Sequence, residues 1–269
     1  MKKWGILTAC ILLAGSLLAG CGSKPSTEGG TAAGDQPAKG KTIVLGTSAD
    51  FPPYEFHKMV NGKDQIVGFD IEIAKEIAKD MGAQLEVKDM SFDALLGELS
   101  SGRVDFVISG LTPDDERRKQ IDFSNNYYKA EQAVVVREAD KDKYSTMKAL
   151  EGVSFGIQKG SIQEDIAKTI QGAKITGLNK ISDIVLQLNS NRVDASIMEK
   201  PVAEAYIKNV KGLAIADAVP DYKEDGYAIG IKKGNTELVN QINKTLDRLK
   251  SENKIEQYVA EASDLAAQK

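Results

Sequence analysis

Apolar residues follow two alternating spacings along the chain from residue 42 onward. Short β-branched runs such as "TIVLGT" and "QLEVKDM" predict strands, and between them Ile71, Ala74, Ile77 and Ala78 recur at helical spacing. The runs "SFDALLGELSSG" and "VDFVISG" continue the same order of helix and strand. Because helix and strand alternate, the pattern predicts an α/β fold with a mostly parallel sheet flanked by helices.

The chain contains an internal repeat. Residues 91–109, "SFDALLGELSSGRVDFVIS", align with residues 180–198, "KISDIVLQLNSNRVDASIM", at a constant offset of 89 positions. Both copies predict a helix, a tight turn, the triplet "RVD" and a strand. We therefore expect two similar α/β lobes and interpret the "RVD" triplet as structural.

Two stretches predict strands that cross between these lobes. They are "AVVVRE", which begins at Ala133, and "YAIGIKKG", which begins at Tyr227 and is followed by an amphipathic pattern typical of a closing helix. This order assigns residues 41–132 and 228–269 to lobe 1 and residues 133–227 to lobe 2. A chain that crosses twice would form a hinge between two lobes.

The first 40 residues have the pattern of an exported lipoprotein precursor. Lysines at positions 2 and 3 precede an apolar run and the sequence "LAGC", which ends at Cys21. We expect a signal peptide over residues 1–20 and a lipid on Cys21, although an uncleaved anchor helix is the alternative. Residues 21–40 are rich in Gly, Ser and Pro, which is typical of a flexible tether. The expected location is outside the cytoplasm, at the surface of the cell membrane.

The composition excludes several classes of function. The net charge is −4 and becomes about −6 without the two signal-peptide lysines, and no basic stripe is present, which argues against nucleic acid as a partner. Cys10 would leave with the signal peptide and Cys21 would carry the lipid. The folded part therefore holds no cysteine for a disulfide, a thiolate metal site or a nucleophile. His57 is the only histidine, so a histidine triad or a multi-histidine metal site is excluded. We expect no catalytic residue, metal or cofactor.

Two predicted helix starts carry capping signals. Thr112, Pro113 and Asp115 match an N-cap, a first helical position and a capping box. The second lobe repeats the arrangement with Ser161 and Glu164. Helix N-termini at the carboxyl ends of strands bind anions, so each lobe would point one helix at a ligand; plain helix initiation is the alternative.

Arg117 and Glu199 form the central hypothesis about the site. An arginine gains nothing from a helix N-terminus, so we expect Asp114, Asp115 and Glu116 to satisfy the helix dipole and Arg117 to bind a ligand anion. The offset of 89 places Glu199 at the end of the second-lobe strand, just before a helix opened by Pro201. Arg117 would then hold the carboxylate of a zwitterion and Glu199 its ammonium, with a salt bridge at the rim as the alternative for Glu199.

The stretch "SADFPPYEF" predicts a rigid loop after the first strand. Its aromatic residue Phe51 and the distant Phe92 could form the two walls of an apolar slot, or plug the core. Two aromatic faces can hold a cationic side chain between them.

The chain closely resembles the polar amino-acid solute-binding proteins of ABC importers, the family of the glutamine, histidine and lysine/arginine/ornithine receptors. The resemblance covers residues 42–258 and rests on "PPYEF", "VGFDIEIAKEIAKDMG", "SGLTPDDERRKQIDFSNNYY" and "QKGSIQED". It implies a two-lobed periplasmic-binding-protein fold of type II with two crossing hinge strands. It also implies ligand-binding roles for Ser109, Gly110, Thr112, Arg117, Ser161, Glu199, Phe51, Phe92, Gln158 and Gln163.

One departure from the family bears on specificity. Several relatives carry an aspartate that contacts the ligand side chain where this chain has Ser48, and Asp50 follows two residues later. In an extended loop the two side chains would lie on the same side, so Asp50 could replace the missing carboxylate. Met198 stands where the glutamine receptor has a histidine, which leaves glutamine selectivity unsupported.

These observations predict a monomeric receptor that closes around an L-amino acid and delivers it to the transmembrane subunits of an ABC permease. The expected ligand is basic: arginine, lysine, histidine or ornithine. The alternatives are a receptor for a polar neutral amino acid such as glutamine, a prephenate or arogenate dehydratase of the same fold, and a sensor domain.

Overall fold

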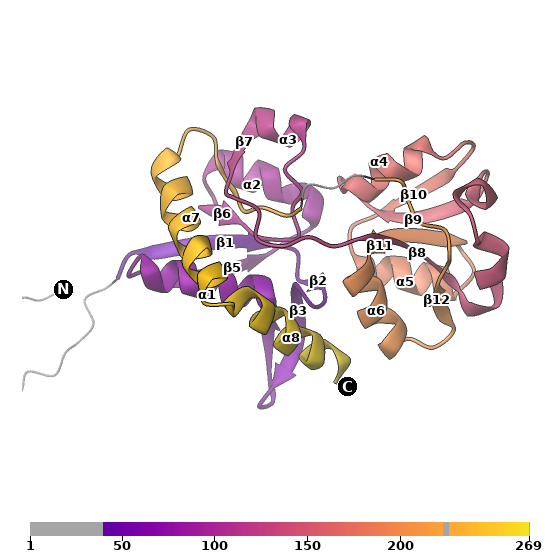
Figure 1. The fold of residues 1–269 in the computed structure, drawn as a ribbon, viewed down its shortest axis with the longest axis horizontal. Coiled ribbons are helices and arrows are strands. Elements are labelled where there is room, and N and C mark those ends of the chain that lie inside the picture. Colours follow the sequence, from indigo (N-terminus) through magenta and orange to yellow (C-terminus); the bar gives the residue numbers. More distant parts are fainter. Residues whose placement is uncertain (1–39, 223–225, 269) are drawn as a thin grey trace, which may run out of the picture. The chain divides into compact units, whose positions relative to one another are not determined.

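The computed structural model describes residues 40–222 and 226–268 (Figure 1). The signal peptide predicted for residues 1–20, the lipidated Cys21 and nearly all of the tether lie outside the described residues.

The strands are β1 (Thr42–Thr47), β2 (Asp50–Phe51), β3 (Glu55–Val60), β4 (Lys63–Val67), β5 (Gln84–Asp89), β6 (Phe106–Val107), β7 (Ile121–Phe123), β8 (Gln132–Arg137), β9 (Ser154–Gln158), β10 (Lys174–Leu178), β11 (Ala195–Glu199), β12 (Leu213–Ile215) and β13 (Gly230–Lys232). The α-helices are α1 (Phe69–Asp80), α2 (Leu95–Ser101), α3 (Asp115–Gln120), α4 (Ile162–Thr169), α5 (Ile181–Asn189), α6 (Lys200–Asn209), α7 (Thr236–Ser251) and α8 (Lys254–Ala267).

Two five-stranded sheets with matching topology form the framework. Their strand orders are β5-β1-β6-β13-β7 and β10-β9-β11-β8-β12. In each sheet the first three strands run parallel, and the last two pair antiparallel with their neighbours. The fold is therefore a two-lobed α/β fold, and its sheets are mixed. The antiparallel strands β8 and β13 each follow a segment that has crossed from the other lobe, so they enter the sheet in the opposite direction.

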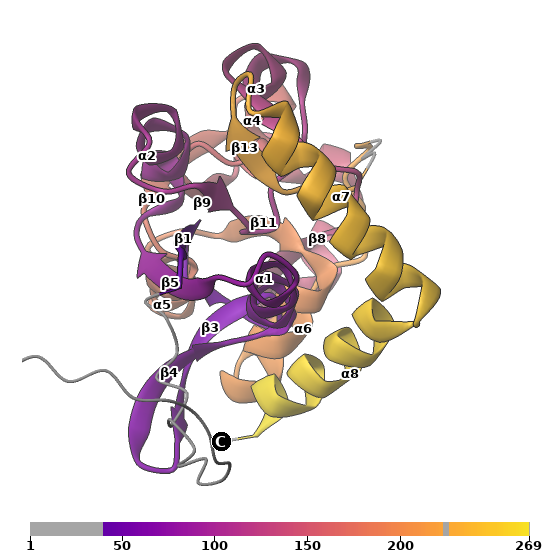
Figure 2. The same cartoon turned by 90° about the vertical axis from the view of Figure 1, so that its left-hand side faces the viewer.

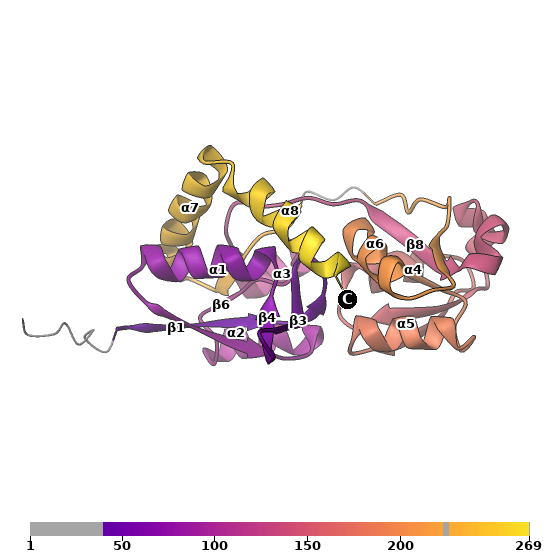
Figure 3. The same cartoon turned by 90° about the horizontal axis from the view of Figure 1, so that it is seen from below.

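The predicted first helix forms as expected. In α1 the apolar positions Ile71, Ile73, Ala74 and Ile77 are all fully or almost fully buried. The chain leaves the helix through Gly82, whose φ of 61° suits glycine. Figure 3 shows α1 on one side of β1 and α2 on the other, so helices cover both faces of the first sheet.

The carboxyl-terminal helices return to the first lobe. Both α7 and α8 contact α1, and Figure 2 shows them alongside it. The sequence predicts a single closing helix, and the structure adds α8. The chain turns between the two helices at Asn253, which adopts the left-handed conformation with φ 54°.

The first crossing segment lies before the predicted stretch, whereas the second passes through Tyr227, where the predicted stretch begins. The stretch from Ala133 is β8, a strand inside the second sheet. The backbone pairing between the two crossings is made by Tyr127 and Tyr128 with Tyr227: the Tyr127 amide donates to the Tyr227 carbonyl, and the Tyr227 amide donates to the Tyr128 carbonyl, both at 2.8 Å. Two antiparallel crossings joined in this way are the geometry of a hinge.

An aromatic cluster packs against this crossing. The ring centroids of Tyr54 lie 4.5 Å from Phe69, 5.8 Å from Tyr128 and 5.7 Å from Tyr227. Aromatic contacts at these separations are favourable beyond the apolar area that they bury. The cluster therefore fixes the hinge to β3 and α1, which also carry residues beneath the candidate site. Within the described residues, no helix combines the length and apolarity that crossing a membrane requires.

Candidate functional site

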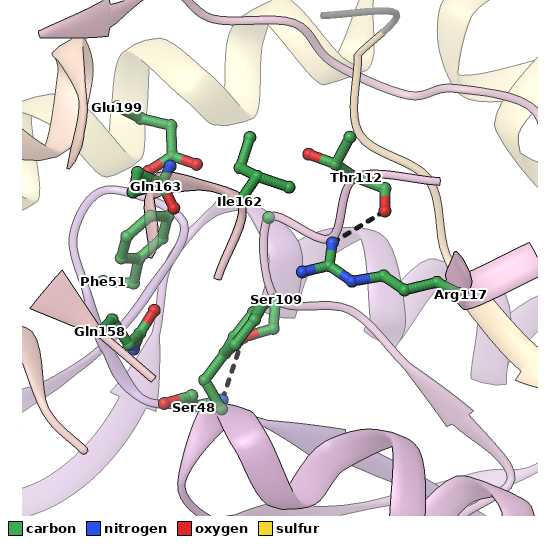
Figure 4. Close-up of a pocket in the computed structure, with 11 residues that line it drawn as sticks. Ser48, Phe51, Ser109, Thr112, Arg117, Gln158, Ile162, Gln163 and Glu199 are labelled. Carbon is green, nitrogen blue, oxygen red and sulfur yellow. Dashed lines mark hydrogen bonds between the residues drawn. The ribbon is translucent and has the colours of Figure 1, made fainter. Parts of the chain in front are cut away.

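One pocket collects residues from both lobes (Figure 4). Ten of the twelve predicted ligand-binding residues line it, together with Ile162, the first residue of α4, which the sequence did not single out. Its position directly after the predicted cap Ser161 is the signal that could have identified it. The lining residues are Ser48, Phe51, Phe92, Ser109, Gly110, Thr112, Arg117, Gln158, Ile162, Gln163 and Glu199.

Arg117 lies buried at one side of the pocket, with 7% of its surface exposed. Its Nη1 donates to the Thr112 carbonyl at 2.8 Å, and its Nη2 donates to the carbonyl of Gly160 in the second lobe at 3.0 Å. Burial lowers the pKa of Arg117, and the neighbouring carboxylate of Asp114 opposes that shift. A guanidinium remains charged even so, which places a fixed positive charge in the pocket.

The cap of α3 differs from the prediction. Asp114, not Thr112, is the N-cap, and its Oδ1 accepts a hydrogen bond from the Arg117 amide at 2.8 Å. Its Oδ2 lies 3.2 Å from Arg117 Nε. A carboxylate satisfies the helix N-terminus and the guanidinium together, which a threonine hydroxyl cannot do. The sequence predicted that Asp114 would satisfy only the helix dipole and leave Arg117 to the ligand. In the structure Asp114 also pairs with Arg117 and holds it in place.

The two predicted aromatic walls have different neighbours. The Arg117 guanidinium carbon lies 5.6 Å from the centroid of the Phe92 ring, a cation–π distance. Phe51 instead packs on Tyr54, with ring centroids 5.1 Å apart. Phe92 thus contacts Arg117 of the protein itself. No cation of the described residues lies over the ring of Phe51.

The loop after β6 approaches Phe51 closely. Gly110 has φ 52°, and a Cβ atom at this position would lie 3.0 Å from Phe51 Cε1. Only glycine combines this conformation with this approach. Beside it, Ser109 Oγ accepts a hydrogen bond from the Ser48 amide at 3.2 Å, so the loops after β1 and β6 are joined at the pocket (Figure 4).

The second lobe contributes carboxylate and amide groups. Glu199 ends β11 directly before α6, which carries proline in its first turn, as the repeat predicted. Glu199 is 3% exposed, and Figure 4 shows its carboxylate and the guanidinium of Arg117 on different sides of the pocket. Gln163 Nε2 donates to Gln132 Oε1 at 2.9 Å, which orients the Gln163 amide, and Gln158 ends β9.

Two predicted site residues do not line the pocket. Asp50 does not project beside Ser48, because its amide donates to the Ser48 carbonyl at 2.9 Å and the loop turns instead of extending. Its Oδ2 accepts a hydrogen bond from the amide of Ser182, in the first turn of α5, at 3.2 Å. Burial raises the pKa of Asp50 to about 6, partly opposed by backbone hydrogen bonds from α5. In this structure Asp50 lies outside the pocket lining, so the geometry does not support its expected role as a replacement for the missing carboxylate.

Ser161 has a capping role. Its Oγ donates to the Gln158 carbonyl at 2.7 Å and accepts from the Glu164 amide at 3.3 Å, as the predicted capping signal requires. The Glu164 carboxylate completes the arrangement by accepting from the Gly160 amide at 2.8 Å. Ser161 thereby fixes the start of α4, which presents Ile162 and Gln163 to the pocket.

The family comparison covers most of the chain. Residues 43–261 match the family of bacterial extracellular solute-binding proteins, family 3. The arginine-binding extracellular protein ArtP of Bacillus subtilis (strain 168) is 41% identical over 265 residues, which cover 95% of this chain and 96% of that protein.

Solved structures agree with this relationship. The amino acid ABC transporter substrate-binding protein AbpA from Streptococcus pneumoniae Canada MDR_19A, bound to L-arginine, matches with a TM-score of 0.83 and 39% identity over 85% of this chain and 97% of that one. An ancestral arginine-binding protein bound to glutamine matches with a TM-score of 0.76 and 37% identity over 82% and 96% of the two chains. The chain belongs to the bacterial extracellular solute-binding proteins of family 3, the two-lobed receptors of amino-acid ABC importers.

Proposed function

We propose that this receptor captures L-arginine by closing its two lobes around the amino acid. The observation that carries the proposal is a pocket in which Arg117 from the first lobe and Glu199 from the second lobe occur together. An α-amino acid presents one anion and one cation on neighbouring atoms, so it needs both signs of charge in one site.

The α-carboxylate is assigned to Arg117. Each terminal nitrogen of its guanidinium carries a second N–H beyond the one that bonds to a protein carbonyl, and two parallel N–H groups match the two oxygens of a carboxylate. Asp114 and Phe92 hold the guanidinium in position, so little ordering is needed when the ligand binds. The α-ammonium is assigned to Glu199.

The ligand side chain is assigned to the space beside Phe51. A guanidinium over an aromatic face gains roughly 0.5–2 kcal/mol, and the amide oxygens of Gln158 and Gln163 are acceptors for its N–H groups. The arginine-binding relatives support this assignment over other basic amino acids. Asp50 has no place in it, since its carboxylate bonds to α5.

Closure is supported by hydrogen bonds that already join the lobes. Besides the bond from Arg117 to Gly160, the Tyr206 hydroxyl of α6 donates to the Asp50 carbonyl at 2.8 Å. A ligand that contacts both lobes stabilises the conformation in which they meet. We assign residues 41–132 and 228–269 to the first lobe and 133–227 to the second, and we propose a monomer that delivers its ligand to the permease subunits of an ABC importer.

Glutamine is the second candidate, because a similar ancestral protein is bound to glutamine in its solved structure. Titration calorimetry of the purified protein with arginine, lysine and glutamine separates the candidates. Arginine should bind at least tenfold more tightly than glutamine, since a charged donor gains more from Phe51 and the amide oxygens than a neutral amide does. Equal affinities would remove the proposed preference.

We further propose that Cys21 carries a lipid that tethers the mature protein to the outer face of the cell membrane. The apolar run before "LAGC" and the tether of residues 21–40 support this proposal. Cys21→Ala should leave arginine affinity intact and release the protein into the medium. Continued retention of the variant in the membrane fraction would contradict the anchor.

We propose a binding role without catalysis. The relatives are solute-binding proteins, and the acids in the pocket are assigned to ligand recognition. Incubation with prephenate or arogenate should therefore leave both compounds unchanged. Formation of a dehydrated product would favour the dehydratase alternative.

A further inference from the structure

Two buried carboxylic acids lie behind the pocket and outside its lining. Glu55 begins β3, Asp70 is the second residue of α1, and both are 0% exposed. They reach the site through its own residues, because Ser109 Oγ donates to Glu55 Oε1 and the Gly110 amide donates to Asp70 Oδ2 at 3.2 Å. The acids therefore contact two lining residues from the protein side.

The pair is also joined to the hinge, and its two acids interact electrostatically. The Tyr127 hydroxyl donates to Asp70 Oδ2 at 2.9 Å, and burial together with the charge of Asp70 raises the pKa of Glu55. One oxygen on each acid, Glu55 Oε2 and Asp70 Oδ1, has no hydrogen-bond partner among the described groups. Two fully buried neighbouring carboxylates repel each other when both are ionised, so the pair favours holding one proton.

The donors indicate which acid carries this proton. Asp70 accepts from Gly110 and Tyr127, whereas Glu55 accepts only from Ser109 in the described part of the chain. Burial raises the pKa of both acids, and the hydrogen bonds that favour the anion are concentrated on Asp70. Glu55 is therefore the neutral partner at neutral pH, and its Oε1 accepts the hydrogen bond from Ser109.

The Ser109 hydroxyl then has a fixed direction. A hydroxyl has one donor and two acceptor positions. The donor of Ser109 points at Glu55, and one acceptor position takes the Ser48 amide at 3.2 Å. Ser109 lines the pocket, so the remaining lone pair is the one available to a ligand.

We propose that Glu55 is a positioning residue that locks Ser109 as a hydrogen-bond acceptor toward the ligand. This inference rests on the proposed amino-acid receptor function. A locked acceptor takes an N–H donor, such as the ammonium of an amino acid or the guanidinium of arginine, and it disfavours a ligand carbonyl at the same place. Glu55 thereby contributes to specificity without touching the ligand.

The test uses two substitutions at Glu55 in the full protein. In Glu55→Gln the amide oxygen can still accept from Ser109 and the side chain stays uncharged, so the variant reproduces the neutral acid. In Glu55→Leu the Ser109 hydroxyl loses its acceptor and is free to rotate. Arginine affinity should fall about tenfold in Glu55→Leu and stay within about threefold of the wild type in Glu55→Gln.

A double-mutant cycle separates this role from a general loss of structure. Ser109→Ala removes the acceptor itself, so adding Glu55→Leu to it should weaken arginine binding by less than Glu55→Leu does alone. Affinities are measured at a temperature at which thermal melts show every variant to be folded. Full additivity of the two substitutions, or an equal loss in Glu55→Gln and Glu55→Leu, would overturn the proposal.

Infrared spectroscopy tests the proton without any ligand. The wild type at neutral pH should show the absorption of a protonated carboxyl group, and Glu55→Gln should lack it. No such difference between the two proteins would overturn the inference, whether or not arginine binds. A wild type that shows the band but binds no amino acid would instead count against the proposed function alone.

Discussion

The two lobes are built alike and differ where they meet the ligand. In the first lobe, the Asp105 amide donates to the Val44 carbonyl at 2.8 Å, and in the second the Asp194 amide donates to the Ser154 carbonyl at the same distance. The valines of the two "RVD" triplets both pack on a strand glycine. A Cβ on Gly46 would lie 3.2 Å from Val104, and one on Gly156 would lie 3.1 Å from Val193.

The likeness ends at the carboxyl ends of β6 and β11. After β6 the first lobe has Ser109 and Gly110, which are hydrogen-bonded to buried acids, and then the helix that carries Arg117. At the equivalent place the second lobe has the carboxylate of Glu199. The repeat therefore keeps the packing of helix on sheet, while the two strand ends carry different chemical groups, which we propose bind opposite ends of a zwitterion.

Removing the positive charge of Arg117 in the first lobe should have the largest effect on ligand affinity. Arg117→Met should weaken arginine, lysine and glutamine alike by about 100-fold or more, because the α-carboxylate shared by all three would be buried without a partner. Titration calorimetry measures the loss. Arg118→Met is the matched control: this exposed arginine lies over Phe123 and donates to the Pro113 carbonyl, outside the pocket lining. Unequal losses among the three ligands would contradict the assignment.

Removing the charge of the second lobe should have a smaller effect. Glu199→Gln keeps the shape and an acceptor oxygen, so arginine affinity should fall about tenfold to 100-fold. Agmatine, which is arginine without its carboxylate, sharpens the comparison. The preference of the wild type for arginine over agmatine should persist in Glu199→Gln and largely disappear in Arg117→Met; the reverse pattern would exchange the roles of the two lobes.

Phe51, the aromatic wall of the first lobe, should affect selectivity between side chains. It should have less effect on affinity for the α-carboxylate and α-ammonium that all amino acids share. Phe51→Leu should reduce the ratio of arginine to glutamine affinity about fivefold, since it removes a cation–π contact and retains an apolar side chain. Phe123→Leu, which changes an aromatic residue outside the pocket lining, is the control. An unchanged ratio in Phe51→Leu would place the ligand side chain elsewhere.

The smallest expected effect concerns pH and the contact between Asp50 and α5. Burial raises the pKa of Asp50 from 3.8 to about 6, so folding favours its protonated form. The stability from this group is fully present below the unfolded-state pKa and is lost as pH rises through about 6. Between pH 4 and 7 Asp50→Asn should therefore remove about 1–2 kcal/mol of pH dependence from the free energy of unfolding.

Chemical denaturation at several pH values measures this dependence. Asp264→Asn, at an exposed position of α8, removes the same formal charge and should leave the pH dependence close to that of the wild type. A wild-type curve that Asp50→Asn does not flatten would mean that the buried carboxylate is not titrating in this range.

Most of the framework could be predicted because it depends on periodic burial. The strands of both repeat copies and helix α1 carry their apolar residues at spacings that only one secondary structure satisfies. The β3–β4 hairpin was missed, although Asn61 and Gly62, both with positive φ, form a typical tight hairpin turn. The six-residue helix α3 was placed too early, because Thr112 and Asp114 are both good caps and sequence alone does not rank them.

The site was predictable to the extent that its residues lie at strand ends. Glu199 ends a buried strand and Arg117 lies on the helix after another, so the order of the elements could place both in one pocket. The turn at Asp50 could not be predicted, since it depends on a backbone hydrogen bond to Ser48 and on α5 from the other lobe. Glu55 and Asp70 were also missed, because an isolated acid in a sequence gives no sign that it is buried beside another.

The most direct test of the division between the lobes is a crystal structure of the protein grown with arginine. We expect the ligand α-carboxylate on the guanidinium of Arg117, the α-ammonium on Glu199, and the ligand side chain against Phe51. A ligand bound in the opposite direction, with its side chain at Arg117, or bound without contact to Glu199, would contradict the account.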